Sequence, residues 1–353
     1  MHARLLITVA VTLGLLFMSV RGAAAAVPPG FFGVAPQDGL TTKDYERMDG
    51  VVGTIRVPVY WPDVEPRPGE RQFAALDDVV GRAADAGIDV LPFVYGSPSW
   101  VTTEPARAPR ASGDRRAWAA FLSAVVRRYG PEGEFWQNRP WRRPIRRWQL
   151  WNEPNFPLFW APRPSPRDYV RLLSSGARSI RAVDPDARIV LAGLAPIEGE
   201  PFPWEYLRRV YTFPAARRSF DAVALHPYSP SMRSLAYQLR ETRRVMAAAG
   251  DGRTPIEITE IGVASSGQFP STMVQGPNGQ ASFLRSAFRL LLKNRRRWRL
   301  EAVIWFTWRD WPTPDRTCVF CQGAGLFDVD DRPKPAWTAY RQMVTASTAH
   351  AVR

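Results

Sequence analysis

The hydrophobic positions of the chain fall into short β-rich runs that alternate with longer amphipathic stretches. The short runs are rich in Val, Ile, Leu, Phe and Trp, which is typical of buried strands. The longer stretches repeat apolar residues every three to four positions, and this period indicates helices that bury one face. Such alternation predicts an α/β fold with a parallel sheet.

Counting these segments narrows the architecture. The predicted strands are residues 31–35, 53–59, 88–95, 146–152, 187–193, 220–226, 255–260 and 301–308. The predicted helices are residues 73–86, 115–129, 165–183, 203–212, 232–249, 280–294 and 336–344. Eight strands joined by helices predict a (β/α)8 TIM barrel. An open doubly wound sheet is the alternative, but the first strand–helix turn lacks G-x-G-x-x-G and the chain has no Walker sequence. We expect one domain over residues 27–353.

The first 26 residues differ in character from the rest of the chain. A short basic start precedes an apolar run over residues 5–20, and residues 23–26 are the small residues typical of a cleavage site. The run is shorter than the ~20 residues of a membrane-spanning helix, so residues 1–26 are expected to be a cleaved signal peptide rather than an anchor. The protein is therefore expected to be secreted, outside the cell or associated with its envelope.

The net charge is strongly positive and comes almost wholly from arginine. The 353 residues carry a net charge of +14, and only Lys43, Lys293 and Lys334 among the 47 basic residues are lysines. The arginines are spread along the chain, which favours a solvated surface over one patch for nucleic acid or membrane. We expect no nucleic-acid partner and no stable membrane insertion. The densest cluster, residues 139–147, leaves an acidic cell-envelope polymer open as a partner.

The two cysteines form a C-x-x-C sequence, Cys318 to Cys321. A zinc site needs about four ligands, and the chain has only three histidines, at positions 2, 226 and 350. A thioredoxin-like redox site would lie between a strand and the start of a helix, whereas this pair lies in a Pro- and Asp-rich loop. In an exported protein we expect a local disulfide that fixes this loop more than it stabilises the whole fold.

Polar and aromatic side chains gather where the predicted strands end. Catalytic residues of such barrels lie at the C-terminal ends of the strands, where the loops build a cleft. The residues at these ends are Arg56, Asn152, Glu153, His226, Tyr228, Glu260, Trp305 and Trp308. Each residue alone also fits a surface, capping or packing role, but together, on five strands, they indicate one site.

Two carboxylates that face one cleft are what the cleavage of a glycosidic bond requires. One must hold a proton for the leaving oxygen, and the other must stay ionised to meet the developing positive charge. Burial and a neighbouring negative charge raise the pKa of the first, while Arg56 and Tyr228 beside Glu260 would keep the second ionised. Trp305 and Trp308 offer flat faces for sugar stacking, or they pack in the core.

At these residues the chain resembles the clan A glycoside hydrolases, most closely family 39 and then family 5. The resemblance rests on "WNEPN" at residues 151–155, "HPY" at 226–228 and "ITE" at 258–260. It extends over residues 31–340, including "RVPVYWPDVEPRPGERQF" in the second βα unit and "GLFDVDDRPKPAWTAY" near the end. It implies a (β/α)8 barrel with O-glycosyl hydrolase activity.

The resemblance also implies a role for each matching residue. Glu153 matches the general acid/base and Glu260 the nucleophile of a retaining double displacement. Asn152 matches the residue that binds the sugar 2-hydroxyl beside the cleaved bond. The other matches orient the nucleophile or the substrate: His226 and Tyr228 on the sixth strand, Arg56 on the second, and Trp305 or Trp308 on the eighth.

Three functions agree with these features. The first is an exported retaining glycoside hydrolase that acts on a polysaccharide or glycoconjugate and needs no metal or organic cofactor. A transglycosylase would use the same residues and let a sugar rather than water reach the intermediate. A non-catalytic carbohydrate-binding barrel would keep the cleft and lack turnover.

Overall fold

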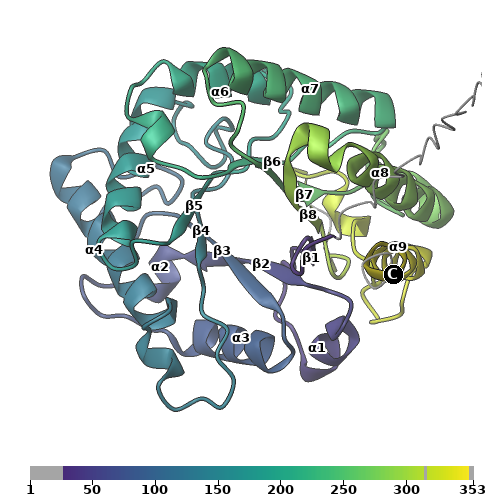
Figure 1. Ribbon diagram of the computed structural model, residues 1–353, viewed down its shortest axis with the longest axis horizontal. Coiled ribbons are helices and arrows are strands. Elements are labelled where there is room, and N and C mark those ends of the chain that lie inside the picture. The colour runs from purple at the N-terminus through teal and green to yellow at the C-terminus, as the bar shows by residue number, and fades with distance from the viewer. Residues whose placement is uncertain (1–26, 314–315, 350–353) are drawn as a thin grey trace, which may run out of the picture.

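The computed structural model describes residues 27–313 and 316–349. Its strands form one eight-stranded parallel sheet in the order β5-β4-β3-β2-β1-β8-β7-β6. The bridges Val190–Ala222 and Leu194–Leu225 join the β5 and β6 edges and close the sheet into a barrel. Figure 1 looks down this barrel and shows the helices in a ring outside the strands. The predicted (β/α)8 TIM barrel is confirmed, whereas the expected signal peptide, residues 1–26, lies outside the described residues.

The elements follow one another in the alternating order that the sequence predicts. The strands are β1 (Phe32–Val34), β2 (Thr54–Tyr60), β3 (Asp89–Tyr95), β4 (Arg147–Leu150), β5 (Arg188–Leu191), β6 (Val223–Leu225), β7 (Ile256–Ile261) and β8 (Leu300–Trp305). The helices are α1 (Thr42–Met48), α2 (Trp61–Val64), α3 (Ala74–Asp85), α4 (Ser112–Tyr129), α5 (Pro166–Arg181), α6 (Pro203–Tyr211), α7 (Met232–Ala248), α8 (Gly276–Trp298) and α9 (Pro335–Ala349).

Several helices differ from the sequence prediction. The sequence pattern misses α1 and α2 because both are too short to repeat an apolar period. It also begins α8 late and ends it early. The first turn of α8 contains Gly and Pro, and its last turn is almost all arginine, so neither end shows an amphipathic pattern. The end of α9 at Ala349 likewise lies beyond the predicted residue 344. These corrections concern two short helices and the ends of longer ones, and the strand order is unaffected.

Side chains alternate between the helix layer and the inside of the barrel. On β2, Ile55 and Val57 pack in the main core between strands and helices, while Arg56 points inside. A second apolar cluster draws residues from β3, β5, β6 and β8, which can meet only inside the barrel. Its members include Leu91, Val190, Ala222, Ala224, Ile304 and Phe306. The barrel is therefore a packed core whose polar groups lie at its two ends.

The polar group at the N-terminal end is an ion pair across the barrel. Arg147, the first residue of β4, places Nη1 3.2 Å from Oε2 of Glu257 on β7. Its Nη2 donates to the hydroxyl of Thr54 at the start of β2. Glu257 is fully buried. This carboxylate therefore lies deep in the barrel, at the end opposite to the strand ends where chemistry is expected.

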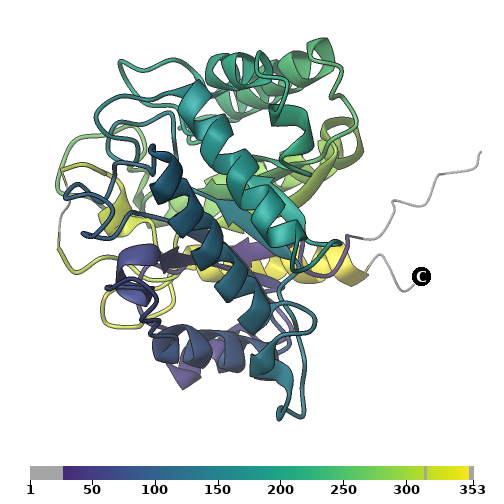
Figure 2. The same ribbon diagram turned by 90° about the vertical axis from the view of Figure 1, so that its left-hand side faces the viewer.

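The outer wall consists of helices packed side by side. Figure 2 shows α4 and α5 lying next to each other across the barrel, and the hydroxyls of Ser123 and Ser179 meet between them at 2.7 Å. Among the helices of the described residues, none combines the length and the apolar content of a membrane span.

Candidate active site

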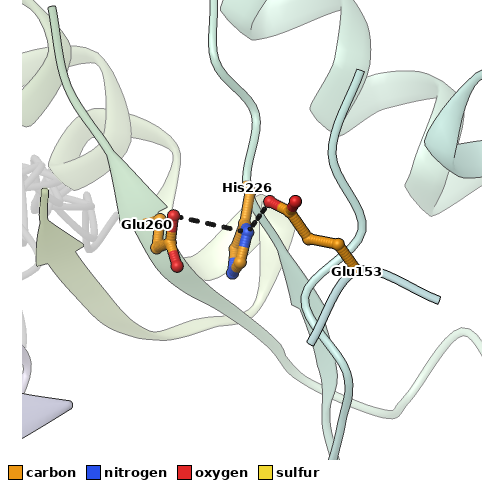
Figure 3. A group of neighbouring side chains, drawn as sticks. All are labelled: Glu153, His226 and Glu260. Atoms are coloured by element: carbon orange, nitrogen blue, oxygen red, sulfur yellow. Dashed lines mark hydrogen bonds and ion pairs between the residues drawn. The ribbon is translucent and has the colours of Figure 1, made fainter. Parts of the chain in front are cut away.

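Six of the predicted site residues meet at the C-terminal end of the barrel, which we call the mouth. They are Arg56, Asn152, Glu153, His226, Tyr228 and Glu260. Hydrogen bonds join four of them around Glu260 and also join Glu153 to His226, and a 3.5 Å contact between His226 and Glu260 connects the two groups. Figure 3 shows the imidazole of His226 between the two carboxylates. Glu153 and Glu260 are each 7 % exposed, so both carboxylates are largely buried yet reach the surface of the mouth.

Two unusual backbone conformations bring Glu153 into the mouth. The φ angles of Trp151 and Glu153 are +77° and +38°, in a region that non-glycine residues rarely adopt. Trp151 turns its indole outward, where it meets Trp118 and Trp160 edge-on. The next two residues can then both point into the barrel, which a regular strand would not allow. Such strain is characteristic of functional sites.

The loop after β4 is fixed to the loop after β5. The backbone N–H of Glu153 donates to the carbonyl of Gly193 at 3.1 Å. The Asn155 amide donates to the carbonyl of Ala195 at 2.7 Å and accepts from its N–H. Gly193 is required here because the Cβ of any other residue would overlap the His226 ring. The last Asn of "WNEPN" thus holds Glu153 in place, a role that the sequence analysis did not assign.

A bulge in β7 brings Glu260 into the same mouth. Thr259 points inside the barrel, where its hydroxyl accepts from the Gln149 amide, so strict alternation would send Glu260 outward. From Ile258 to Ile261, β7 advances three residues while β8 advances two. The extra residue is a β-bulge, which re-aims a side chain, as bulges next to active sites do.

Arg56 is the hub of the polar network. Its Nη1 donates to Oε1 of Glu260 at 2.6 Å, and its Nη2 donates to Oδ1 of Asn152 at 2.8 Å. Its Nε donates to Oε1 of Gln149 at 2.6 Å, and the guanidinium lies 3.8 Å from the ring centre of Phe93. Gln149 and Phe93 were missed by the sequence analysis because a Gln and a Phe within strands carry no motif.

The two carboxylates have different partners. Glu260 accepts from Arg56 on one oxygen and from the Tyr228 hydroxyl, at 2.6 Å, on the other. Glu153 has Nδ1 of His226 2.6 Å from its Oε1, and the same nitrogen lies 3.5 Å from Oε2 of Glu260. One oxygen of each carboxylate and one His226 nitrogen lie within 4.8 Å of one another. The carboxylates are therefore close enough to act on a single sugar carbon.

These environments move the pKa values of the site. Burial, together with the charge of Glu260, raises the pKa of Glu153 well above its usual range. Burial also raises the pKa of Glu260, but Arg56 and the Tyr228 hydroxyl oppose that rise by stabilising the charged form. Burial and Arg56 lower the pKa of His226, so its imidazole is neutral. The site therefore favours a proton on Glu153 and a negative charge on Glu260.

The same three residues are the one cluster of potential metal ligands among the described residues. Glu153, His226 and Glu260 could each offer one atom to an ion. Both oxygens of Glu260, however, already accept hydrogen bonds, one of them from the cationic Arg56. A divalent ion would have to compete with this guanidinium at short range, so the donor set fits an ion poorly.

The structure corrects the expectation that a tryptophan of the eighth strand faces the substrate. Trp305 is fully buried, lies against Phe283 of α8 and donates its N–H to a backbone carbonyl. Trp308 is 1 % exposed, packs edge-on against Trp337 of α9 and donates to the Asp44 carboxylate. Both indoles lie in the helix layer, as the packing alternative predicted. Alternation along β8 turns Trp305 outward, whereas Trp308 lies beyond the end of β8 and is held outside by Asp44 and Trp337.

The aromatic side chain of this strand that faces the mouth is Phe306. It belongs to the cluster inside the barrel and meets the Tyr228 ring edge-on at 6.0 Å. Trp311 and Phe320 from the loop after β8 pack against the same cluster and stay half-exposed. The sequence analysis missed Phe306 because its neighbours Trp305 and Trp308 are the residue types expected to bind sugars.

Other carboxylates near the mouth have structural partners. Glu65 is buried and accepts from the indole N–H of Trp61 and the backbone of Gly69. Asp310 is buried and accepts from Lys334 at 2.7 Å. Both carboxylates fix loops, whereas Glu153 and Glu260 reach the surface of the mouth.

Comparisons with known proteins agree with this architecture. No family model and no curated protein sequence matches the chain, but many solved structures do. A family 39 glycoside hydrolase from Bacteroides cellulosilyticus WH2 is 20 % identical with a TM-score of 0.66, over 90 % of this chain and 64 % of that one. A β-xylosidase from Caulobacter crescentus CB15 is 22 % identical with a TM-score of 0.63, over 90 % of this chain and 69 % of that one.

A family 10 enzyme from Paenibacillus barcinonensis is 18 % identical with a TM-score of 0.62, and the match covers 93 % of this chain and 96 % of that one. At these identities the matches show a shared fold. The resemblance to clan A glycoside hydrolases is thus confirmed at the level of the barrel. The chain spans about two thirds of the length of the first two structures.

Proposed function

We propose that the protein is a retaining glycoside hydrolase, with Glu260 as the nucleophile and Glu153 as the general acid/base. The observation that carries the proposal is the unequal surroundings of two adjacent carboxylates. Glu260 accepts hydrogen bonds from two donors, of which Arg56 is cationic. The hydrogen-bond partner of Glu153 is the neutral imidazole of His226. Their spacing, with oxygens within 4.8 Å, agrees with the ~5–5.5 Å of retaining pairs rather than the ~6.5–9.5 Å of inverting pairs.

In the proposed reaction Glu260 attacks the anomeric carbon while Glu153 gives its proton to the leaving oxygen. The glycosidic C–O bond breaks and a bond from the sugar to Glu260 forms. Glu153, now ionised, takes a proton from water, and the water oxygen displaces Glu260 from the sugar. Arg56 and Tyr228 would keep Glu260 charged and oriented. The Asn152 oxygen accepts from Arg56, so its amide nitrogen would donate to a sugar hydroxyl.

The test is a pair of variants on one strand. Glu260→Gln should lower kcat on an aryl glycoside by at least about a thousandfold, because it removes the nucleophile. Glu257→Gln is the matched control, since this carboxylate lies at the other end of β7, and its kcat/KM should stay close to that of the wild type. Unchanged release of sugar by Glu260→Gln would refute the catalytic assignment.

Two related functions are outcomes of the same experiment. A protein that binds oligosaccharide with no turnover in either the wild type or the variants would be a carbohydrate-binding barrel. Sugar products longer than the substrate, formed only with Glu260 intact, would identify a transglycosylase. An activity-based label that attaches to Glu260 supports both catalytic outcomes, because each forms the same covalent intermediate.

The first substrates to test are β-xylosides, because one neighbouring structure is a β-xylosidase. Aryl glucosides and mannosides, polysaccharides and anionic cell-envelope polymers complete the panel. We propose further that the protein is exported by the signal peptide over residues 1–26. A mature N-terminus close to Ala26, found by sequencing the protein from the medium or the envelope, is the expected result.

A further inference from the structure

The C-x-x-C loop has no part in the mechanism above, yet it lies against the mouth. Cys318 and Cys321 form a disulfide, as the sequence analysis expected. Cys321 is buried and belongs to the apolar cluster inside the barrel, together with Phe306 and Ala324. Cys318 packs against the same cluster. The disulfide therefore adjoins the catalytic end of the barrel and not its outer wall.

Phe320, between the two cysteines, reaches Tyr228. Their ring centres lie 5.0 Å apart with the planes at 60°. Phe306 of the mouth meets the Tyr228 ring at 90° and 6.0 Å. Tyr228 in turn donates its hydroxyl to Glu260 at 2.6 Å. Two phenylalanines thus hold the ring whose hydroxyl contacts the proposed nucleophile.

The two sides of this loop are anchored differently. After the disulfide, the carbonyl of Gly323 accepts from the buried ammonium of Lys334 at 2.9 Å and from the backbone N–H of Ser265 at 2.8 Å. Before Cys321, the backbone carbonyl of Phe320 accepts from the Gly323 N–H at 3.3 Å, and the Phe320 ring contacts Tyr228. The disulfide links Cys318, two residues before Phe320, to Cys321, so it ties this turn to the anchored side.

We infer that Phe320, clamped by the Cys318–Cys321 disulfide, is a positioning residue that keeps the Tyr228 hydroxyl on Glu260. The inference rests on the proposed function. Phe320 acts through Tyr228, with which its ring is in contact. Without this ring Tyr228 has more orientations available, so its hydroxyl spends less time on the carboxylate. The nucleophile is then less well placed for attack.

The experiment is a double-mutant cycle on kcat. Phe320→Ala should lower kcat by about tenfold, the effect of weakening one hydrogen bond to a charged group. KM should change by less than about twofold, because no substrate contact is lost. In the Tyr228→Phe background, which has no hydroxyl to position, Phe320→Ala should cost less than about twofold more. Phe320→Tyr keeps the ring and should restore most of kcat.

A control residue comes from the other end of the barrel. Phe135 is likewise half-buried and packs against Tyr129 and Trp136, before β4 begins. Phe135→Ala should leave kcat unchanged in both backgrounds. Equal losses from Phe320→Ala with and without the Tyr228 hydroxyl would overturn the inference, because they would show an effect that does not pass through Tyr228.

The disulfide arm uses a dithiol on the native enzyme. Dithiothreitol supplies two electrons and two protons, so the S–S bond opens to two thiols while the reagent closes to its cyclic disulfide. Mass spectrometry after thiol alkylation confirms the reduction. Reduced wild type should show the same fall in kcat as Phe320→Ala, and reduction of Tyr228→Phe should have little further effect. If the completely reduced enzyme keeps its full kcat, the disulfide does not hold Phe320 in position and this part of the inference is overturned.

Failure of the proposed function gives a different pattern. An inactive wild type refutes the hydrolase, and the inference is then read from urea unfolding, which needs no substrate. If Phe320 holds the hydroxyl on Glu260, the shifts of the urea midpoint by Phe320→Ala and Tyr228→Phe are less than additive. Additive shifts overturn the inference whether or not the protein cleaves sugars.

Discussion

The chemistry of the site follows from what each carboxylate touches. Glu260 lies between a guanidinium and a phenol hydroxyl, and both interactions stabilise its charge. Glu153 lies beside the charge of Glu260, which together with burial raises the pKa of Glu153 well above its usual range. Burial disfavours the charge on both carboxylates. Because only Glu260 has a cation in contact, Glu153 is the one that favours its neutral, protonated form.

The proposed role of Glu153 as the acid predicts a dependence on the leaving group. Glu153→Gln should lower kcat/KM by roughly 10²–10⁴-fold for alkyl or sugar leaving groups, which need a proton. The loss should be far smaller for a nitrophenyl glycoside, whose leaving oxygen is stable without one. Comparing kcat/KM over a series of leaving groups measures this. Equal losses across the series would contradict the assignment of Glu153 as the acid.

The hydrogen bond from Tyr228 predicts a shift in the pH profile. This bond lowers the pKa of Glu260 because it stabilises the charged form. Tyr228→Phe removes it, so the pKa of Glu260 should rise and the acidic limb of kcat/KM should move to higher pH. As the pH falls, the variant should therefore lose kcat/KM at a higher pH than the wild type does. A limb that stays in place or moves to lower pH would contradict this reading.

At the scale of elements, local irregularities decide which side chains reach the mouth. A bulge in β7 turns Glu260 inward beside Thr259. Just after β4, the positive φ angles of Trp151 and Glu153 turn the Glu153 side chain inward in the same way. At the end of β8, Trp305 points to the helix layer and the next residue, Phe306, points inside the barrel.

This geometry of β8 predicts opposite effects for two aromatic residues. Phe306→Ala should raise KM for oligosaccharides, because it removes the ring at the mouth, and should change kcat less. Trp308→Phe should leave KM unchanged and lower stability by about 1–3 kcal/mol, since the Trp308 indole N–H holds the buried Asp44 carboxylate. Steady-state kinetics and urea unfolding of both variants measure this. A raised KM in Trp308→Phe would show instead that Trp308 stacks on the sugar.

At the scale of the whole molecule, the densest arginine cluster and the proposed catalytic residues lie at opposite ends of the barrel. Two members of the densest arginine cluster pair at the N-terminal end, Arg143 with Asp89 at the start of β3 and Arg147 with Glu257 inside. Arg139 of the same cluster lies over the ring of Phe135. An acidic polymer held by this cluster would be bound away from the mouth.

This separation predicts how salt acts on the protein. Raising NaCl from about 0.05 M to about 0.5 M should release the protein from an anionic polysaccharide column, because exposed charges are screened. The same change should leave kcat/KM on a neutral aryl glycoside nearly constant, since the Arg56–Glu260 pair is buried. A steep loss of kcat/KM with salt would instead show that the binding site for the acidic polymer lies at the mouth.

The sequence by itself determined the barrel and most of the site. Eight apolar runs separated by amphipathic stretches suffice for the strand order, because hydrophobic periodicity and chain connectivity both act locally. The motifs "WNEPN", "HPY" and "ITE" named five of the six polar residues that meet at the mouth, and the second strand supplied Arg56. Position at a strand end was enough to place them on one face.

The tertiary structure decided everything that depends on which way a side chain points. Neither the β7 bulge nor the positive φ of Trp151 leaves a mark in the hydrophobic pattern, so the inward turn of Glu260 and Glu153 could not be derived from it. The side-chain directions at the end of β8 decide that Phe306, rather than Trp305 or Trp308, faces the mouth. The contact of Phe320 with Tyr228 joins residues 92 positions apart, and only the closed barrel brings them together.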